Sequence, residues 1–371
     1  MQDNTYYTLA LTRVPGLGLI GAYNLIRAVG NAKDIFLHRK ELSEWIPDVS
    51  DKLIHALDCP EAFKRAEEEL LYAERNNICC LTIHDERYPS RLRECEDAPL
   101  VLFYRGNANL NALHVISMVG TRHSTAYGQE LCQAFVADLA EACPDVLIVS
   151  GLAYGIDIHS HRAAIHHHLP TVGVLAHGLD RIYPAAHRQT AIEMMDYGGL
   201  LTEFMSGTNP DRQNFVKRNR IVAGMTDAVI VVESAVKGGA LITAELAESY
   251  HRDCFAFPGR ITDLYSVGCN ELIKNNRASL ILSADDFVKA MGWNASKSRR
   301  QEAIQRELFP ELSEEETRIV QVLQEVEGCM QINVLTVKTN LPINHLSALL
   351  FELEMKGVVQ ALAGGMYRLI Q

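Results

Sequence analysis

The stretches VLIVS (146–150) and AVIVVES (228–234) decide the fold of this chain. Each places apolar side chains at consecutive positions, so both faces of the strand that it forms must be buried. Amphipathic helical patterns separate these two stretches from further apolar runs along the chain. This alternation is typical of a parallel sheet that helices cover on both faces, and it predicts a doubly wound α/β domain.

The same alternation extends from these two strands over residues 76–293. We therefore predict an extended Rossmann-like fold with a mostly parallel sheet for this segment. Its strands are expected at 78–83, 100–105, 114–119, 145–150, 171–176, 199–204, 227–233, 253–257 and 279–283.

Residues 1–75 have helical periodicity and one tight turn, Pro15-Gly16-Leu17-Gly18. This pattern predicts a helical domain of the SAM or helix-hairpin-helix kind. Backbone amides in such a turn can contact a DNA phosphate, but a plain packing role explains the turn equally well.

Residues 294–312 have no sustained apolar period and contain a proline, so they are predicted to be a linker. Residues 313–371 begin with a capping box, in which Glu316 follows Ser313 at the required spacing. Two helices and a predicted hairpin around Gly364-Gly365 then complete the pattern of a winged helix. This unit carries four Lys or Arg residues against seven glutamates, so we expect it to contact protein or to bind DNA weakly.

The composition places the chain among ordinary globular proteins, with 48% hydrophobic and 22% charged residues. Neither a membrane-spanning run nor a secretion signal is evident among the 371 residues, and a cytoplasmic location is expected. The nine cysteines include no C-x-x-C pair, which argues against a disulfide framework and a zinc ribbon. A net charge of −11 means that any nucleic-acid site must be a focused patch of cations.

Four loops that contain glycine follow the carboxyl ends of predicted strands, at 120–124, 150–157, 178–184 and 234–243. Glycine lets a ligand approach the backbone, and Arg122 adds a forked cation to the first loop. One such loop alone would be an ordinary strand-to-helix turn, but four at one edge of a sheet favour an anion site. None matches the dinucleotide-binding or P-loop pattern, so no cofactor is expected.

The sequence NFVKRNR (214–220) holds three cations in four positions. Helical spacing lets Lys217 and Arg220 point together at a backbone phosphate. Phe215 and Tyr154 are candidates for stacking on bases, which would give sequence-tolerant single-strand binding. The competing interpretation is a solvated helix turn with one core phenylalanine.

These motifs together resemble the DNA-processing protein A (DprA/Smf) family over about 80–290. The resemblance is carried, in the family's order, by GTRHSTAYG, SGLAYGIDIHSHRAA, GLDRIYP, NFVKRNRIVAG and KGGALITAELAESYHRDCFAFPG. It implies a homodimer without catalytic activity that binds and protects single-stranded DNA during natural transformation and loads the recombinase RecA onto it.

The resemblance also implies which residues contact DNA, while Asp157 matches a helix-capping aspartate with a structural role. The family often has a serine where Ala240 stands, which puts one hydroxyl–phosphate bond in doubt. The implied DNA contacts are Gly120, Arg122, Ser124, Gly151, Asn214, Phe215, Lys217, Arg218, Arg220, Lys237 and Gly239.

Two other kinds of site compete with DNA binding in this sequence: a nucleotide-processing active site and a metal site. GGALITAE (238–245) is similar to the motif of phosphoribohydrolase-like nucleotide-processing enzymes, in which Arg122 and Glu245 would act, but it lacks that motif's proline and middle glycine. Glu203 could be a buried acid near the site, although a pairing or capping role is preferred. The histidines at 159, 161 and 166–168 have only Asp157 as a possible further ligand, so no metal site is expected.

Overall fold

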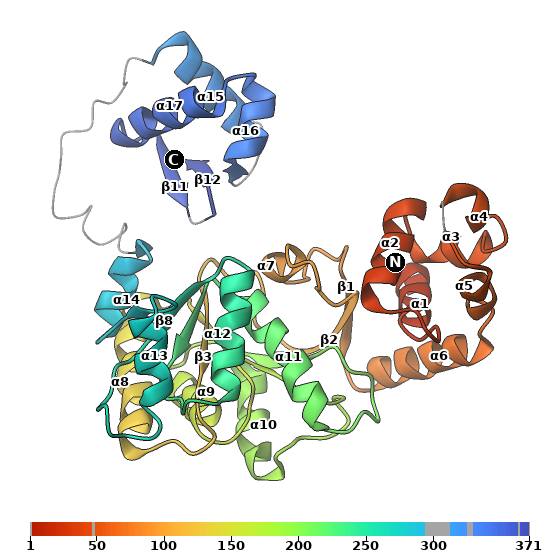
Figure 1. Ribbon diagram of the computed structural model, residues 1–371, viewed down its shortest axis with the longest axis horizontal. Coiled ribbons are helices and arrows are strands. Elements are labelled where there is room, and N and C mark those ends of the chain that lie inside the picture. The colour runs from red at the N-terminus through yellow and green to blue at the C-terminus, as the bar shows by residue number, and fades with distance from the viewer. Residues whose placement is uncertain (1, 47–48, 294–311, 325–328, 363, 371) are drawn as a thin grey trace. The chain divides into compact units, whose positions relative to one another are not determined.

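The computed structural model describes residues 2–46, 49–293, 312–324, 329–362 and 364–370 (Figure 1). Two compact units make up the chain, Met1–Trp293 and Asn294–Gln371. The linker predicted at 294–312 lies outside the described residues, except for Leu312.

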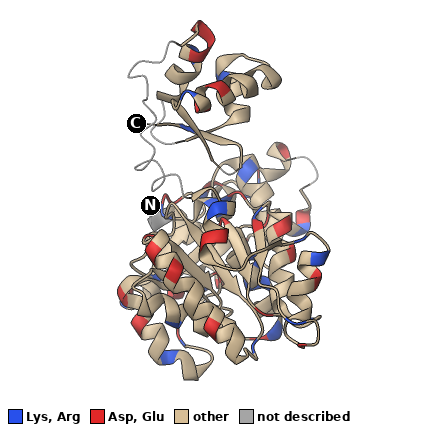
Figure 2. Cartoon of the chain, turned by 90° about the vertical axis from the view of Figure 1, so that its left-hand side faces the viewer, with Lys and Arg blue, Asp and Glu red and all other residues tan. Residues whose placement is uncertain are grey.

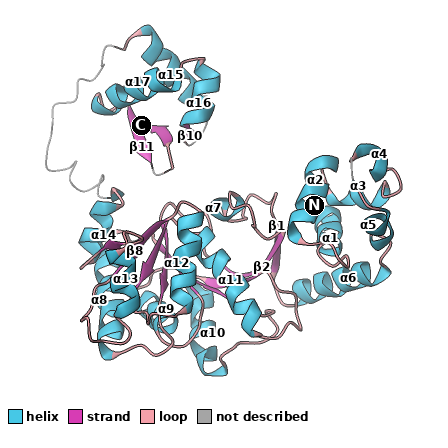
Figure 3. Cartoon of the chain, viewed as in Figure 1, coloured by secondary structure: helices cyan, strands magenta, loops and turns pink. Residues whose placement is uncertain are grey.

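The larger unit is built on a nine-stranded sheet, which Figure 3 shows in magenta among the helices. Counted from one edge, the first two strands pair antiparallel with each other, and the second also pairs antiparallel with the third. The third to the ninth strand run parallel. All the predicted strands are present and the doubly wound, mostly parallel fold is confirmed, although the last strand is only two residues long. The order across the sheet is β1 (Cys79–Thr82), β2 (Val101–Gly106), β6 (Gly199–Thr202), β5 (Thr171–Val174), β4 (Leu147–Ser150), β3 (Val115–Val119), β7 (Ala228–Val231), β8 (Asp253–Ala256) and β9 (Ser279–Leu280).

Strand β4 shows why the apolar runs decide the fold. Leu147 and Val149 belong to the core that contains helices α11 (Arg212–Gly224) and α12 (Gly239–Ser249). Ile148 belongs to the opposite core, with helices α8 (Ala126–Ala142), α9 (Ile156–His166) and α14 (Ala284–Ala290). Because successive side chains of a strand point to opposite faces, a strand covered on both sides must be apolar throughout. The remaining helices of the sheet region are α7 (Ser90–Arg93), α10 (Arg188–Tyr197) and α13 (Val267–Lys274).

Six helices precede the sheet, as the periodicity of residues 1–75 predicts. The turn at 15–18 joins the first two of them, and Gly16 there has a φ of 77° that favours glycine. Buried side chains of these helices, including Leu9 and Leu11, belong to the same core cluster as Leu81 and Phe103 of the sheet. The division at residue 75 stays a sequence prediction. The helices are α1 (Gln2–Leu11), α2 (Leu19–Val29), α3 (Ala32–Leu37), α4 (Leu42–Trp45), α5 (Asp51–Ala56) and α6 (Pro60–Arg75).

In the part of the smaller unit that the structure describes, three helices and a three-stranded sheet form the arrangement of a winged helix. The predicted capping box is present: the Ser313 amide donates to Glu316 Oε2 at 2.7 Å, and the Glu316 amide donates to Ser313 Oγ at 3.2 Å. The elements are α15 (Glu314–Gln324), β10 (Met330–Gln331), α16 (Ile332–Thr339), α17 (Ile343–Met355), β11 (Val359–Leu362) and β12 (Met366–Leu369).

Candidate nucleic-acid interface

Three of the segments singled out in the sequence meet around the ring of Phe215, near the start of α11. The Arg122 guanidinium lies 4.9 Å from the centre of this ring. The Tyr183 ring lies 6.1 Å from it, with the two ring planes at 60°. Arg122 is exposed and Phe215 half-buried, so this cluster offers a cation and aromatic faces to solvent.

Tyr183 belongs to the GLDRIYP loop, but it is not one of the DNA contacts that the family resemblance implies. Tyr183 is 47% exposed, so part of its ring is open to a ligand although it contacts the Phe215 ring. The sequence signal for a role of Tyr183 at the site was its position in a glycine-containing loop that follows the carboxyl end of a strand. Tyr154, the other stacking candidate, lies instead against His187, with 4.8 Å between ring centres.

Two exposed lysines lie on neighbouring elements. Lys217 is on α11, and Lys237 lies just before α12. The side-chain amide of Asn219 donates to the Gly239 carbonyl at 3.4 Å and so links the two helices. Gly238, the N-cap of α12, provides no side-chain cap, so the first amides of that helix stay available to an anion.

Arg218 does not match its expected role as a DNA contact. Its side chain is 4% exposed, and Nη1 donates to the Val174 carbonyl at 2.5 Å inside the domain. Burial lowers the pKa of this guanidinium, and Asp157 partly opposes that effect. A Cβ on Gly151 would overlap the Arg218 guanidinium, so Gly151 is required for packing here and is itself buried.

Arg220 also departs from the expectation that it joins Lys217 at a phosphate. Its guanidinium forms an ion pair with Glu203 and donates to the Asp97 carbonyl, and its side chain is 13% exposed. Burial raises the pKa of Glu203, while Arg220 and Lys217 lower it. The pairing role preferred for Glu203 is therefore confirmed. Arg220 joins α11 to Glu203 and Asp97 within the domain.

The start of α8 is already occupied by a protein carboxylate. Glu233, which is 2% exposed, accepts from the Thr125 amide at 2.9 Å and from the Thr125 hydroxyl at 2.5 Å. The Thr125 amide at this helix start is thus bonded within the protein. The acidic residue within AVIVVES was the sequence signal for this cap. An anion at this edge would meet the loop of Gly120, Arg122 and Ser124 that precedes the helix.

The remaining expected contacts have supporting roles in the structure. A Cβ on Gly120 would overlap Ile156, so this loop passes closely over α9. The Ser124 hydroxyl accepts from Gln129 at 3.3 Å, and the Asn214 side chain donates to the Asn209 carbonyl at 3.0 Å. Asp157 is 8% exposed and accepts from the Ala153 amide at 3.4 Å, in keeping with a structural role.

The family model for DNA recombination-mediator protein A matches residues 79–292 of this chain. The chain belongs to the DNA recombination-mediator protein A family. A second model, for the DprA winged helix domain, matches residues 306–365. The fold and the family resemblance predicted from the sequence are thereby confirmed.

Relatives in this family match long parts of the chain. Protein Smf of Escherichia coli is 33% identical over 318 residues, which cover 82% of this chain and 81% of that protein. The DNA processing protein DprA of Streptococcus pneumoniae is 36% identical over 232 residues, covering 62% of this chain and 79% of that protein. The putative DNA processing protein DprA of Mycobacterium tuberculosis is 37% identical, and the match spans 66% of this chain and 65% of that protein's length.

Two solved structures of the family are similar to this one. DNA processing protein A from Streptococcus pneumoniae has a TM-score of 0.58 and 32% identity, covering 74% of this chain and 97% of that one. DNA processing protein A from Helicobacter pylori, described for its single-stranded DNA binding mode, has a TM-score of 0.53 and 27% identity, covering 58% of this chain and 96% of that one.

The enzyme alternative is not favoured in this member of the family. Glu245, which would stabilise the reacting ribose, is 57% exposed and forms an ion pair with Arg277 at 3.3 Å. Such an exposed, paired carboxylate lacks the enclosed setting that glycosidic chemistry uses.

Neither a metal site nor a membrane span is found in the part of the chain that the structure describes. Those residues contain no group of three or more His, Cys, Asp or Glu placed to hold a metal ion. His161 lies in the core, where burial lowers its pKa to about 3 and Nδ1 is 2.7 Å from Thr171 Oγ1. None of the described helices is both long and apolar enough to cross a membrane.

Proposed function

We propose that this chain binds single-stranded DNA at the edge of the sheet where the carboxyl ends of the parallel strands and their glycine loops lie. The proposed contact surface, called the strip, consists of Arg122, Tyr183, Phe215, Lys217, Lys237 and Gly239. The observation that carries the proposal is the Arg122–Phe215–Tyr183 cluster, together with the exposed Lys217 on the same helix as Phe215. A cation next to a half-exposed aromatic ring suits a nucleotide whose phosphate meets the cation and whose base stacks on the ring. Lys237 and Gly239, which are both exposed, extend the strip toward α12 with a third cation and a glycine backbone that an anion can approach.

A focused strip is needed because the molecule as a whole is acidic. Figure 2 shows acidic and basic positions interleaved over the helices rather than segregated to one face. A duplex would carry phosphates past acidic positions outside the strip, whereas one strand can follow a narrow path. The acidic surroundings of the strip therefore favour single strands over duplex DNA.

The wider role follows the family. We infer that the chain is a cytoplasmic, homodimeric and non-catalytic protein that protects incoming DNA and loads RecA recombinase during transformation or recombination. Two observations support DNA rather than a nucleotide as the ligand: the strip has several cations, and the related Helicobacter pylori protein is described as a single-stranded DNA binder. No cofactor or metal is part of this proposal.

The test removes two exposed cations of the strip, Arg122 in the cluster and Lys217 on α11. In the double variant Arg122→Ala/Lys217→Ala, affinity for a fluorescent oligothymidine should fall about tenfold or more, because two phosphate contacts are lost. The slope of log affinity against log salt should become shallower by about 1.4, since each single-strand phosphate contributes about 0.7. Fluorescence anisotropy at several salt concentrations, with single- and double-stranded oligonucleotides, measures both quantities.

The matched control is Lys289→Ala. This lysine lies on α14, where its side chain is 63% exposed and pairs with Asp285 at 2.5 Å. Its replacement changes the net charge but alters no residue of the strip. Its affinity should stay within about twofold of the wild type. Equal affinity of the double variant and the wild type at moderate salt would show that the strip is not the DNA site.

A further inference from the structure

A buried carboxylate on α6 holds the loop that leads from β6 into α11. Glu69 is 2% exposed, and its two oxygens accept from the Ser206 amide at 2.9 and 3.0 Å. The Ser206 hydroxyl also donates to Glu69 Oε2 at 2.6 Å. These bonds join residues that are 137 positions apart in the sequence.

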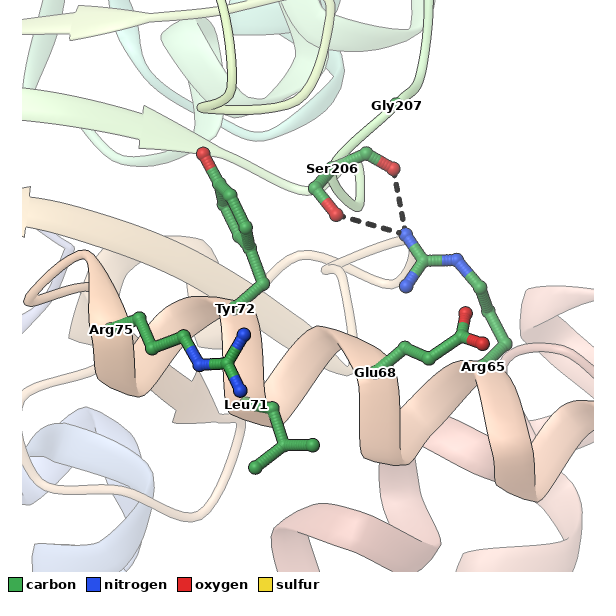
Figure 4. Close-up of a pocket in the computed structure, with 7 residues that line it drawn as sticks. All are labelled: Arg65, Glu68, Leu71, Tyr72, Arg75, Ser206 and Gly207. Carbon is green, nitrogen blue, oxygen red and sulfur yellow. Dashed lines mark hydrogen bonds between the residues drawn. The ribbon is translucent and has the colours of Figure 1, made fainter.

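Arg65 closes the arrangement from the next turn of the same helix. Its Nη2 donates to Glu69 Oε2 at 2.8 Å and to the Ser206 carbonyl at 2.7 Å. Figure 4 shows this guanidinium reaching from α6 to the Ser206 backbone and side chain. Both polar groups of the Ser206 peptide are thus held by one helix. Arg65, Glu69 and Ser206 together form what we call the α6 clamp.

The hydrogen bonds of the clamp form only when the loop that carries Ser206 lies in this position. A carboxylate as buried as Glu69 is costly unless charged or polar donors satisfy its oxygens. Here the donors are one arginine on its own helix and two groups of Ser206. If the loop moved away, Glu69 would lose most of its hydrogen bonds while still covered by the helix. The energy of the buried charge therefore favours one position of the loop.

The loop is fixed from the other side by the GLDRIYP segment. The Gly207 amide donates to Asp180 Oδ1 at 2.9 Å, and Arg181 Nη1 donates to Asn209 Oδ1 at 2.8 Å. The Asn209 carbonyl in turn accepts from the Asn214 side chain in the first turn of α11. A continuous chain of bonds thus runs from Glu69 to the segments that carry Phe215 and Tyr183.

Open space beside the clamp makes the loop dependent on these bonds. A groove of about 470 Å³ lies between α6 and the loop (Figure 4). An added Cβ on Gly207 would have no heavy atom within 4 Å. No side chain therefore packs against Gly207 from that direction, and the bonds of Ser206 and Gly207 add to the core packing of Met205 in holding the loop. The groove is lined by Arg65, Glu68, Leu71, Tyr72, Arg75, Ser206 and Gly207.

We propose that Glu69 is a positioning residue for DNA binding, which acts through Ser206 to set the start of α11 and the direction of Phe215 and Lys217. The inference rests on the proposed function of that strip. It gives the N-terminal helices a part in DNA affinity that no contact of their own with the strand would supply.

The sign of one substitution separates positioning from plain electrostatics. Glu69→Gln removes a negative charge, so long-range electrostatics alone would leave affinity for a polyanion unchanged or raise it. Loss of the clamp should instead weaken oligothymidine binding about three- to tenfold, because a site held loosely by its supporting residues loses affinity. Glu68→Gln is the matched control: it removes the same charge from an exposed neighbour on the same helix, and it should bind at least as tightly as the wild type.

A double-variant cycle distinguishes positioning from a general loss of stability. If Glu69 acts through the start of α11, Glu69→Gln should cost little further affinity in a Phe215→Ala background. Additive losses in folded protein would overturn the proposal. Amide hydrogen exchange should also rise across 205–214 in Glu69→Gln and not in Glu68→Gln.

The measurements remain decisive if one variant folds poorly. Ser206→Ala deletes only the hydroxyl contacts to Glu69 and Arg65, so it is the milder variant and should show a smaller loss of the same sign. Lys217→Ala reports on the strip itself. Weaker binding by Lys217→Ala, with wild-type binding by folded Glu69→Gln and Ser206→Ala, would overturn the clamp alone. Wild-type binding by Lys217→Ala would reject the proposed strip.

Discussion

At the scale of single residues, the most informative position is Arg218, a cation that the fold hides. Helical spacing places Phe215, Arg218 and Val222 on one face of α11. That face packs inward, since Val222 is 2% and Arg218 4% exposed. A run of cations in a sequence therefore overstates the charge that a surface offers. Of the three cations in NFVKRNR, Lys217 is exposed, Arg220 is half-buried and Arg218 is buried.

Gly151 provides a test of this arrangement. Gly151→Ala should destabilise the protein by about 1–3 kcal/mol, because the added methyl overlaps the buried Arg218 guanidinium and forces it to shift. Gly239→Ala is the control, since a Cβ there would lie 3.9 Å from its nearest neighbour, the Asn219 side chain. Urea unfolding measures both, and equal stability of the two variants would contradict the assigned packing role.

At the scale of elements, α17 differs from the recognition helix of a DNA-binding winged helix. Ile343, Phe351 and Met355 are 45%, 64% and 75% exposed along it. Two nearby cations are engaged within the unit: Lys356 with Glu316 at 2.6 Å, and Arg368 with Gln360 at 2.9 Å. The exposed apolar side chains and engaged cations support the prediction that this unit contacts protein or binds DNA weakly.

The Glu316–Lys356 pair makes the winged unit sensitive to acid. Burial raises the pKa of Glu316, but hydrogen bonds from Lys356 and Ser313 outweigh it and leave the pKa below 4.5. A carboxyl group with a lowered pKa stabilises the fold above its unfolded value, and this stability is lost as the pH falls through the folded value. Urea unfolding followed by NMR signals of α17 should show this loss below pH 4.5. The loss should be smaller in Glu316→Gln, and an identical pH dependence in that variant would contradict the assignment.

At the scale of the whole molecule, the buried clusters divide between the two units. The cores of the larger unit use residues between Leu9 and Val288, and the core of the smaller unit uses residues from Ile319 to Val359. Every residue of the proposed strip and of the α6 clamp lies in Met1–Trp293. Affinity for single strands should therefore depend on the larger unit.

A chain that ends at Trp293 tests this division. It should stay folded, because no side chain of its cores is removed, and should bind oligothymidine within about twofold of the full chain. Circular dichroism and anisotropy provide the two measurements. A folded truncated chain with strongly reduced affinity would show that the winged unit contributes to the site.

The sequence predicted the layers of the fold well, because burial on both faces leaves a pattern along each strand. Every strand of the large sheet and the capping box at Ser313 were predicted from local patterns. Local patterns also singled out Arg122, Phe215, Lys217 and Lys237, which belong to glycine loops or a cation-rich run, and their role in the proposed strip stays a prediction.

What only the tertiary structure decided is which polar groups meet. Glu203 pairs with Arg220, Glu233 caps α8, and Glu69 holds Ser206, each across a long stretch of sequence. Local periodicity reports how much of a side chain is buried, but it does not identify the partner that burial brings to it. The sequence by itself thus determined the sheet, its loops and the family. The folded chain alone divided the cations of α11 between the surface and the core, because a buried charge needs partners that only long-range contacts supply.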